Sequence, residues 1–331
     1  MREVCEAGTN APHPRRIAIG IGDDAAVWQA SRSHRSAITT DVLVDGVHFI
    51  SGAMTPGEIG HRAMAANLSD LAAMGARPTL AVVALGLPPQ TEAEWVLAAY
   101  RALAALAARH GATIAGGDLS RAPVLTLAIA AVGEVSARRT KRRSGGRPGD
   151  VLATTGPLGA SRAGLEILRT GLAVSDDVRA EAHAAFATPQ PRVREGRWLA
   201  ASAGVHAMMD CSDGLALDAG RMVRASGCGA TIERVPVHPA ALAVAAAAGA
   251  DPEGWALAGG EDFELIVAVA PRAFPHLAAA FARRFGRPLE RVGVLAAGEG
   301  LKRNAGGALQ ALPELGWDHL AGLEPAERSS G

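Results

Sequence analysis

Hydrophobic and polar positions alternate along the N-terminal part of the chain with two different periods. Met64, Leu68 and Leu71 recur at the spacing of one helix face, and Gly75 then provides a plausible C-terminal cap. β-branched and apolar runs bounded by turn residues predict strands instead. The predicted elements are strands over 37–43, 80–87, 113–115 and 124–135 and helices over 56–75 and 92–110.

The C-terminal part repeats this mixture after a basic and then turn-rich segment, 138–150. Its predicted elements are strands over 151–155, 206–209, 230–235, 263–269 and 291–295 and helices over 161–169 and 215–226. The pattern predicts an α+β (α/β mixed) fold. We expect a flexible N-terminal arm at 1–16, one domain over 17–148 and a second over 149–331.

Composition narrows the functional class. The 331 residues are 49% hydrophobic and 20% charged, which is typical of a soluble globular enzyme. The formal net charge is zero, which argues against a nucleic-acid-binding protein. The N-terminus lacks the apolar core of a signal peptide, no stretch is long and apolar enough to cross a membrane, and the three cysteines lack metal-ligand or redox spacing. We therefore expect a cytoplasmic protein with no membrane or nucleic-acid partner.

Carboxylates in Gly-, Ser- and Thr-rich turns are the most informative polar feature. They occur in Gly22-Asp23-Asp24, Thr39-Thr40-Asp41, Asn67-Leu68-Ser69-Asp70, Gly116-Gly117-Asp118, Asp210-Cys211-Ser212-Asp213-Gly214 and Gly259-Gly260-Glu261-Asp262. No basic residue is adjacent to any of these groups, and two carboxylates about 4 Å apart repel by roughly 4 kcal/mol at an effective dielectric near 20. If the fold gathers them, hard divalent cations are the natural counter-charge, and Mg²⁺ usually brings phosphates. For any single aspartate a turn or helix cap is the favoured explanation, but this explanation becomes strained for the whole set.

Common nucleotide-binding motifs are absent. The chain has only two lysines, Lys141 and Lys302, and neither stands in a Gly-Lys-Ser/Thr loop or in the protein-kinase motif set. The loop and helix start over 156–164 could hold phosphate on backbone N–H groups or could simply connect two elements. The arginines of 138–143 could grip a phosphate or form a solvated linker, and His48 and Trp317 could contact substrate or be structural.

The motifs together resemble thiamine-monophosphate kinases, a family within the aminoimidazole-ribonucleotide-synthetase-like superfamily. The resemblance runs from about Ile17 to Leu320, and the Asn-Leu-Ser-Asp helix combined with Gly-Gly-Glu-Asp is its most specific part. It implies a two-domain architecture in which the N-terminal sheet domain binds Mg²⁺ and ATP and dimerises, and the C-terminal α/β domain completes the substrate site. It also implies ATP and several Mg²⁺ ions at the domain junction.

The resemblance also implies site residues, position by position. The implied Mg²⁺ ligands are Asp24, Thr39, Thr40, Asp41, Asp70, Asp118, Asp210 and Asp213. The implied nucleotide contacts are Gly117, Asp118, Arg143 and Ser212, and the implied substrate contacts are His48, Glu261 and Trp317. Among these we expect Asp41, Asp118 and Asp213 to be catalytic.

The resulting hypothesis is ATP-dependent phosphorylation of thiamine monophosphate to thiamine diphosphate in a homodimer, by direct in-line transfer. The acceptor phosphate is already ionised at neutral pH, so positioning and electrostatics would carry most of the rate. Two alternatives remain: another ATP-dependent synthetase of the superfamily, of the cyclising or selenophosphate type, and a non-catalytic Mg-nucleotide-binding module.

Overall fold

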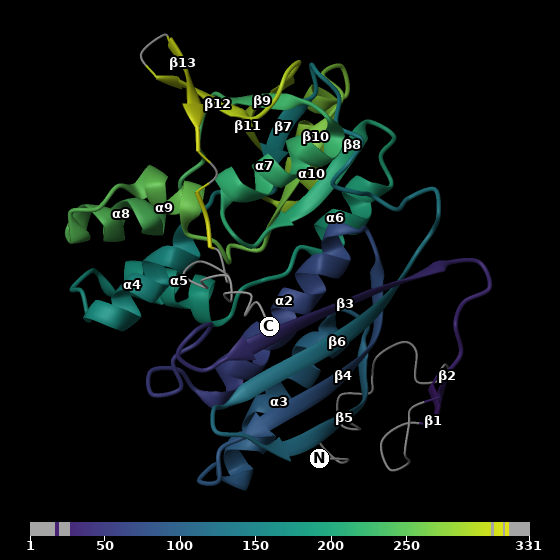
Figure 1. The fold of residues 1–331 in the computed structure, drawn as a ribbon, viewed down its shortest axis with the longest axis vertical. Coiled ribbons are helices and arrows are strands. Elements are labelled where there is room, and N and C mark those ends of the chain that lie inside the picture. The colour runs from purple at the N-terminus through teal and green to yellow at the C-terminus, as the bar shows by residue number, and fades with distance from the viewer. Residues whose placement is uncertain (1–16, 20–26, 306–307, 314, 318–331) are drawn as a thin grey trace, which may run out of the picture.

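The computed structural model describes residues 17–19, 27–305, 308–313 and 315–317. Two larger β-sheets dominate it, and helices lie between and around them (Figure 1). A short antiparallel pair, β1 (Ile17–Ile19) and β2 (Val27–Trp28), lies apart from both sheets. The predicted mixed α/β class is confirmed. The domain limits at 17–148 and 149–331 stay a prediction.

The smaller sheet comes from the N-terminal part and has four strands in the order β3-β6-β4-β5. These are β3 (Arg35–Val44), β6 (Thr126–Val135), β4 (Arg77–Leu87) and β5 (Thr113–Arg121). β6 pairs antiparallel with β3 and with β4, whereas β4 and β5 run parallel. The register places Asp41 opposite Ile129 of β6, so this carboxylate lies within the paired part of the sheet.

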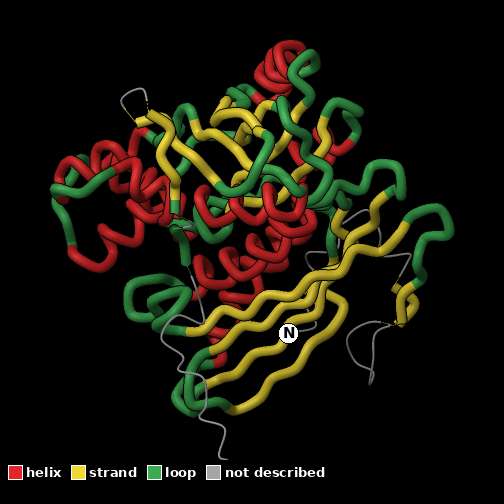
Figure 2. Tube along the Cα trace, turned by 45° about the horizontal axis from the view of Figure 1, so that its top comes forward, coloured by secondary structure: helices red, strands yellow, loops and turns green. Residues whose placement is uncertain are grey.

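Helices α2 (Pro56–Ala73) and α3 (Ala93–Arg109) cover only one face of this sheet (Figure 2). Because strand residues alternate between faces, Thr39 and Asp41 point toward the helices, while Ile38 and Val42 stay exposed. α2 begins where the sequence favours it: Thr55 and Glu58 form a reciprocal capping box, and Pro56 occupies the first turn. Among the described residues, no element packs on the opposite, apolar face.

The larger sheet has seven strands in the order β13-β12-β9-β11-β7-β10-β8. They are β7 (Val151–Thr154), β8 (Val205–Cys211), β9 (Gly229–Ile232), β10 (Glu264–Val269), β11 (Glu290–Ala296), β12 (Leu301–Ala305) and β13 (Ala308–Leu312). The helices of this part are α4 (Ala160–Thr170), α5 (Asp176–Ala187), α6 (Val193–Ala200), α7 (Leu215–Ser226), α8 (Pro239–Ala248), α9 (Pro252–Ala258) and α10 (Phe274–Phe285). No helix within the described part of the chain is long and apolar enough to cross a membrane.

One hydrophobic core runs from the smaller sheet into the larger one. α2 packs against β3 and β6 on one side and against α6 and β8 on the other. Leu68 of α2, Leu199 of α6 and Leu265 of β10 belong to the same buried cluster. α2 therefore holds the two sheets in a fixed relation, and side chains along it can face both.

The sequence prediction was wrong about β5. The strand was expected to end at Ala115 and to deliver Asp118 in a turn, but it continues through Gly116, Gly117 and Asp118 to Arg121. Parallel pairing with β4 holds these glycines in the ladder. A Cβ at Gly117 would lie 1.9 Å from the carbonyl oxygen of Val83, so close backbone approach alone requires glycine there.

A substitution at the α2–α6 contact tests this packing. A Cβ at Gly196 would lie 2.2 Å from the carbonyl oxygen of Ala72, and two helix backbones cannot separate without opening the shared core. We expect Gly196→Ala to lower the free energy of unfolding by about 1–3 kcal/mol. This change should lower the melting temperature by several degrees. Gly57→Ala, also a helical position but with only an ordinary 3.7 Å contact, should not lower it. Calorimetry showing equal melting temperatures for both variants would contradict the packing described.

Candidate active site

A cavity of about 440 Å³ opens where the two sheets meet. Thr39 of β3 and Asp70 of α2 line it from the smaller sheet, and Asp210 of β8 lines it from the larger one. Arg142 and Arg143, from the segment that joins the two sheets, also line it. The structure thus brings acidic residues that are far apart in sequence into one cavity.

Ser69 and Asp70, adjacent on α2, connect the two sides of this cavity. The hydroxyl of Thr39 donates to Oδ2 of Asp70. The hydroxyl of Ser69 donates to Oδ2 of Asp210, 2.8 Å away across the junction of the sheets. The helical pattern of α2 explains this arrangement, because its apolar stripe packs into the core and leaves Asp70 at the edge.

Burial raises the pKa of the aspartates in and beside the cavity, and nearby charges modify the effect. Burial raises the pKa of Asp41 to about 7, and the charges of Asp70 and Asp213 add to the effect. Burial raises the pKa of Asp70, although the Thr39 hydrogen bond and the charge of Arg143 oppose this change. Burial and the charge of Asp70 raise the pKa of Asp210 well above its usual range. The ionised forms are therefore costly in the free protein.

This donor set fits a hard divalent cation. Oδ2 of Asp41 is buried and has no hydrogen-bond partner in the structure, as expected of an oxygen that ligates a cation. Within the described ranges, no three His, Cys, Asp or Glu side chains are close enough to hold one ion by themselves. Mg²⁺ is usually bound by one or two carboxylates together with water and substrate phosphates, so an incomplete protein cage is what such a site requires.

The turn between β8 and α7 carries Ser212 and Asp213. Their backbone N–H groups both donate to Oδ2 of Asp218, at 3.0 and 2.9 Å. Arg221 donates to Asp213 and to Oδ1 of Asp218. Asp218 and Arg221 were not among the predicted site residues, and the pairing of Arg221 with Asp213 was not predicted because no basic residue is adjacent to Asp213 in the sequence. The helical spacing of these two residues, three apart in the first turns of α7, is the signal that was available.

Glu261 and Trp317 are held against this same turn through their backbones. The N–H of Glu261 donates to the Ser212 carbonyl oxygen at 2.7 Å, and that of Trp317 donates to the Asp213 carbonyl oxygen at 3.0 Å. Glu261 has a φ of 58° and Phe263 a φ of 50°, unusual for residues other than glycine. Such backbone strain often accompanies a functional loop. Trp317 is 50% exposed, so its ring is accessible to a ligand.

His48 lies on the smaller-sheet side, in the turn after β3. Its Nδ1 accepts a hydrogen bond from the Val44 N–H at 3.0 Å, which fixes the ring orientation. Arg62, a fully buried residue of α2 that the sequence analysis did not single out, donates to the His48 carbonyl oxygen and forms an ion pair with Glu261. The expected substrate contacts from the two parts of the chain are thus connected through one arginine.

Of the predicted site residues, Thr39, Asp70, Arg143 and Asp210 line the cavity. Asp41 and Asp213 lie near enough for their charges to interact with this group, whereas Thr40 and Asp118 lie elsewhere. Asp118 is exposed on the uncovered face of the smaller sheet, where it accepts a 2.6 Å hydrogen bond from Ser120. Thr40 also points to this face and donates to the Ile129 carbonyl oxygen at 3.0 Å. β3 and β5 form opposite edges of the sheet, so these two side chains are separated within one chain. Asp24 lies outside the described residues.

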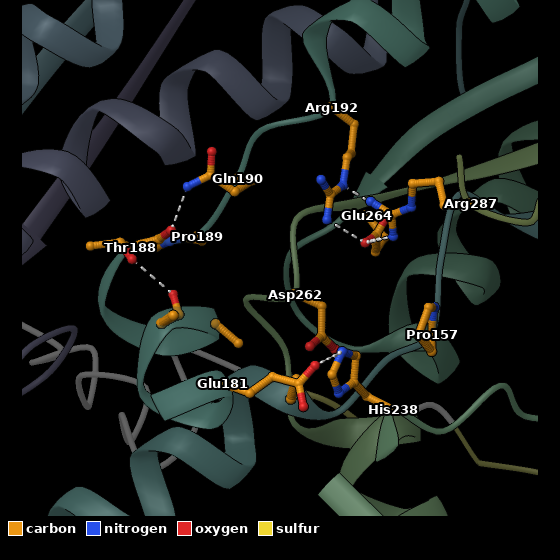
Figure 3. A pocket seen from close by; sticks show the side chains of 13 residues that line it. Pro157, Glu181, Thr188, Pro189, Gln190, Arg192, His238, Asp262, Glu264 and Arg287 are labelled. Carbon is orange, nitrogen blue, oxygen red and sulfur yellow. Dashed lines mark hydrogen bonds and ion pairs between the residues drawn. The ribbon is translucent and has the colours of Figure 1, made fainter. Parts of the chain in front are cut away.

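A second cavity, of about 230 Å³, lies between α4, α5, α8 and β10 (Figure 3). Its charges are already matched: Arg192 and Arg287 both pair with Glu264, and His238 lies 3.7 Å from Glu181. Asp262 accepts from the N–H groups of Gly159 and Ser161, at 2.8 and 3.2 Å. The carboxylate therefore occupies the helix start that was considered for phosphate, which favours the connector interpretation of that loop.

Two family models and several known proteins are similar to this chain. The chain matches the models for AIR synthase related protein, N-terminal domain, over residues 22–135 and AIR synthase related protein, C-terminal domain, over residues 147–306. It is 41% identical over 258 residues to the thiamine-monophosphate kinase of Synechococcus elongatus, a match that spans 76% of this chain and 77% of that protein. The chain belongs to the thiamine-monophosphate kinase family.

Solved structures of the family share the whole architecture. The thiamine-monophosphate kinase from Stenotrophomonas maltophilia K279a superposes with a TM-score of 0.82 and 33% identity over 92% of this chain and 96% of that chain. AaThiL complexed with AMPPCP and TMP superposes with a TM-score of 0.77 and 27% identity over 88% of this chain and 89% of that chain. The resemblance drawn from the motifs is confirmed, and so is the presence of two domains of the AIR synthase related type.

Proposed function

We propose that this protein transfers the γ-phosphoryl group of ATP to thiamine monophosphate, forming thiamine diphosphate and ADP. The observation that carries the proposal is the convergence of Asp70 and Asp210 at one cavity, with Asp41 near Asp70. Burial raises the pKa of all three, and the charge of Asp70 adds to this effect at Asp41 and Asp210. Such a site is unfavourable when empty and becomes favourable when cations and phosphates enter together. Family membership supports the choice of acceptor, because AaThiL is complexed with AMPPCP, an ATP analogue, and TMP.

The chain's own residues would bind and align two anions. Asp41, Asp70, Asp210 and Asp213, with the hydroxyl of Thr39, would hold Mg²⁺, which neutralises the phosphates and spreads the charge that develops during transfer. Asp24, Thr40 and Asp118 complete the proposed ligand set.

Nucleotide and acceptor would then meet at the β8–α7 turn. Arg143 lines the cavity beside Asp70, and Gly117, Asp118 and Ser212 are the other proposed nucleotide contacts. Glu261 and Trp317, both bonded to this turn, and His48 would contact thiamine monophosphate. An oxygen of the acceptor phosphate would form the new P–O bond as the bond to the ADP oxygen breaks. The acceptor oxygen is already ionised, so no general base is required.

A homodimer would bring the remaining residues into the site. The uncovered face of the smaller sheet carries Ile38, Val42 and Val82, which are 73%, 48% and 37% exposed. Two such faces stacked about 10 Å apart would bury this apolar surface. If the twofold axis runs parallel to the strands, β5 of one subunit lies opposite β3 of the other. Asp118 would then approach Thr40 of the partner subunit, which explains why a single chain separates them.

The cytoplasm remains the proposed compartment. Cys211 and Cys228 are both buried and unpaired, as expected where disulfides do not form.

The decisive experiment is direct detection of thiamine diphosphate. Purified protein with ATP, Mg²⁺ and thiamine monophosphate should form thiamine diphosphate and ADP in equal amounts, measured by chromatography. Formylglycinamidine ribonucleotide and selenide, each replacing thiamine monophosphate, test the synthetase alternatives. ATP consumption with one of these and not with thiamine monophosphate would overturn the proposal, and ATP binding without turnover of any acceptor would favour a binding module.

A further inference from the structure

We propose that Arg62 is the positioning residue that fixes the two proposed substrate contacts, His48 and Glu261, relative to each other. The inference rests on the proposed function and adds to it a residue that holds the acceptor side of the site together. Arg62 is on α2, whereas Glu261 belongs to the loop before β10. One side chain of the smaller-sheet part therefore controls a loop of the larger-sheet part.

The guanidinium group of Arg62 makes two hydrogen bonds and one ion pair. Nε donates to the His48 carbonyl oxygen at 3.0 Å, Nη1 donates to the Phe186 carbonyl oxygen, and Nη2 forms the ion pair with Glu261. The guanidinium carbon lies 4.0 Å from the centre of the Phe186 ring. The two hydrogen bonds and the Phe186 ring fix the orientation of the guanidinium group. Glu261 is then held by the charge of this group, through an ion pair and not through a hydrogen bond.

Burial separates the role of Arg62 from that of its partner. The side chain of Arg62 is 1% exposed, while that of Glu261 is 33% exposed. Arg62 is therefore shielded from a ligand, and Glu261 can reach one. Glu261 also has the positive φ noted above and a backbone hydrogen bond to Ser212. The ion pair and this hydrogen bond together would hold a strained loop in one conformation.

A purely structural role predicts something different, and the chain offers a matched control. Glu58 lies one turn before Arg62 on α2 and forms a 2.6 Å contact with His183, which lies three residues before Phe186 on α5. This contact also joins α2 to α5, but it touches neither Glu261 nor His48. His183→Gln therefore removes a side-chain contact between the same two helices without disturbing the proposed acceptor site.

The test compares steady-state kinetics of Arg62→Lys and His183→Gln. A lysine keeps the charge but cannot satisfy all three partners. We expect Arg62→Lys to raise KM for thiamine monophosphate about tenfold while changing KM for ATP by less than about threefold. His183→Gln should leave both KM values within about twofold. Equal changes in both KM values for Arg62→Lys, or equal behaviour of the two variants, would overturn the inference.

Two further variants keep the inference testable. Arg62→Lys and Glu261→Gln combined should raise KM for thiamine monophosphate by less than the product of the two single changes, because both disturb the contact between Arg62 and Glu261. Additive effects would contradict the proposal. If Arg62→Lys does not fold, Phe186→Leu, which removes the ring beneath the guanidinium, should give a smaller rise confined to the same KM. A wild-type protein that makes no thiamine diphosphate would refute the proposed function instead.

Discussion

Replacing Asp41 by Asn is expected to lower turnover at least about 100-fold and to raise the melting temperature of the metal-free protein. Activity falls and stability rises because the Asp41 carboxylate is needed to bind the cation and the phosphates, whereas in their absence its buried charge destabilises the folded protein. Asp41 has a buried oxygen without a partner in the structure, and its charge is opposed by Asp70 and Asp213. Asparagine keeps the shape and removes the charge.

The pH dependence follows from the raised pKa of Asp41. Its folded-state pKa is about 7, above the usual 3.8, so between these values the unfolded chain loses the proton and the folded protein keeps it. Asp41 therefore destabilises the folded state progressively as pH rises from about 4 to about 7, by about 1.4 kcal/mol for each pH unit in that interval. Asp41→Asn should remove this contribution. The melting temperatures of the wild-type and variant proteins should therefore be equal near pH 4, and the variant should become the more stable of the two toward pH 7.

Calorimetry with and without Mg²⁺ and ATP, combined with the thiamine diphosphate assay, measures both effects. Asp150→Asn is the matched control, because Asp150 is also buried but its carboxylate bonds to His206 and to the Arg147 N–H, at 2.8 and 2.9 Å. Asp150→Asn should lower the melting temperature, because it weakens the buried hydrogen bonds from His206 and the Arg147 N–H. It should leave turnover within about threefold, because Asp150 does not line the cavity. Near-normal turnover of Asp41→Asn at limiting Mg²⁺ would refute the role assigned to Asp41.

Local patterns in the sequence were sufficient where neighbours along the chain determine the structure. The helix predicted over 56–75 is α2, because the apolar stripe, the Thr55–Glu58 capping box and Gly75 all act within a few residues. The strand predicted over 37–43 lies within β3, and the alternation of a strand is sufficient to put Thr39 and Asp41 on one side of it. The Ala-rich helices α5 and α8 were not predicted. They are held by a separate small cluster of buried residues, which requires the tertiary fold.

The placement of Asp118 and the ion pairs of two buried or half-buried arginines depend on contacts between residues far apart in the sequence. Whether Asp118 joins the other aspartates depends on the strand order β3-β6-β4-β5 and on which face of β5 it occupies, and neither is encoded near Gly116-Gly117-Asp118. Arg62 and Arg221 were missed for a related reason. Each lies in a helix among apolar residues, and their acidic partners Glu261 and Asp213 become visible only when the chain is folded.

A charged substitution on the uncovered face of the smaller sheet should have the second large effect on activity. Val82→Arg should convert a dimer into a monomer and lower thiamine diphosphate formation at least about 100-fold. Val82 is in the inner strand β4 and faces outward, so a charge there would be buried without a partner between two stacked sheets. The folded single chain tolerates the arginine, because the position is 37% exposed. Activity would fall because Asp118 could no longer approach Thr40 of the partner subunit.

Light scattering gives the mass in solution, and circular dichroism checks that the variant remains folded. Leu242→Arg is the matched control: Leu242 is 48% exposed on α8, away from the sheet face, and its replacement should change neither mass nor turnover. Mixing Val82→Arg with Asp118→Asn protein should not restore activity if dimerisation itself is blocked. Two results would contradict this prediction: a wild-type protein that is monomeric with full turnover, or a monomeric Val82→Arg variant that retains wild-type turnover. Either result would show that Asp118 acts within one chain or not at all. Other residues would then have to complete the ligand set.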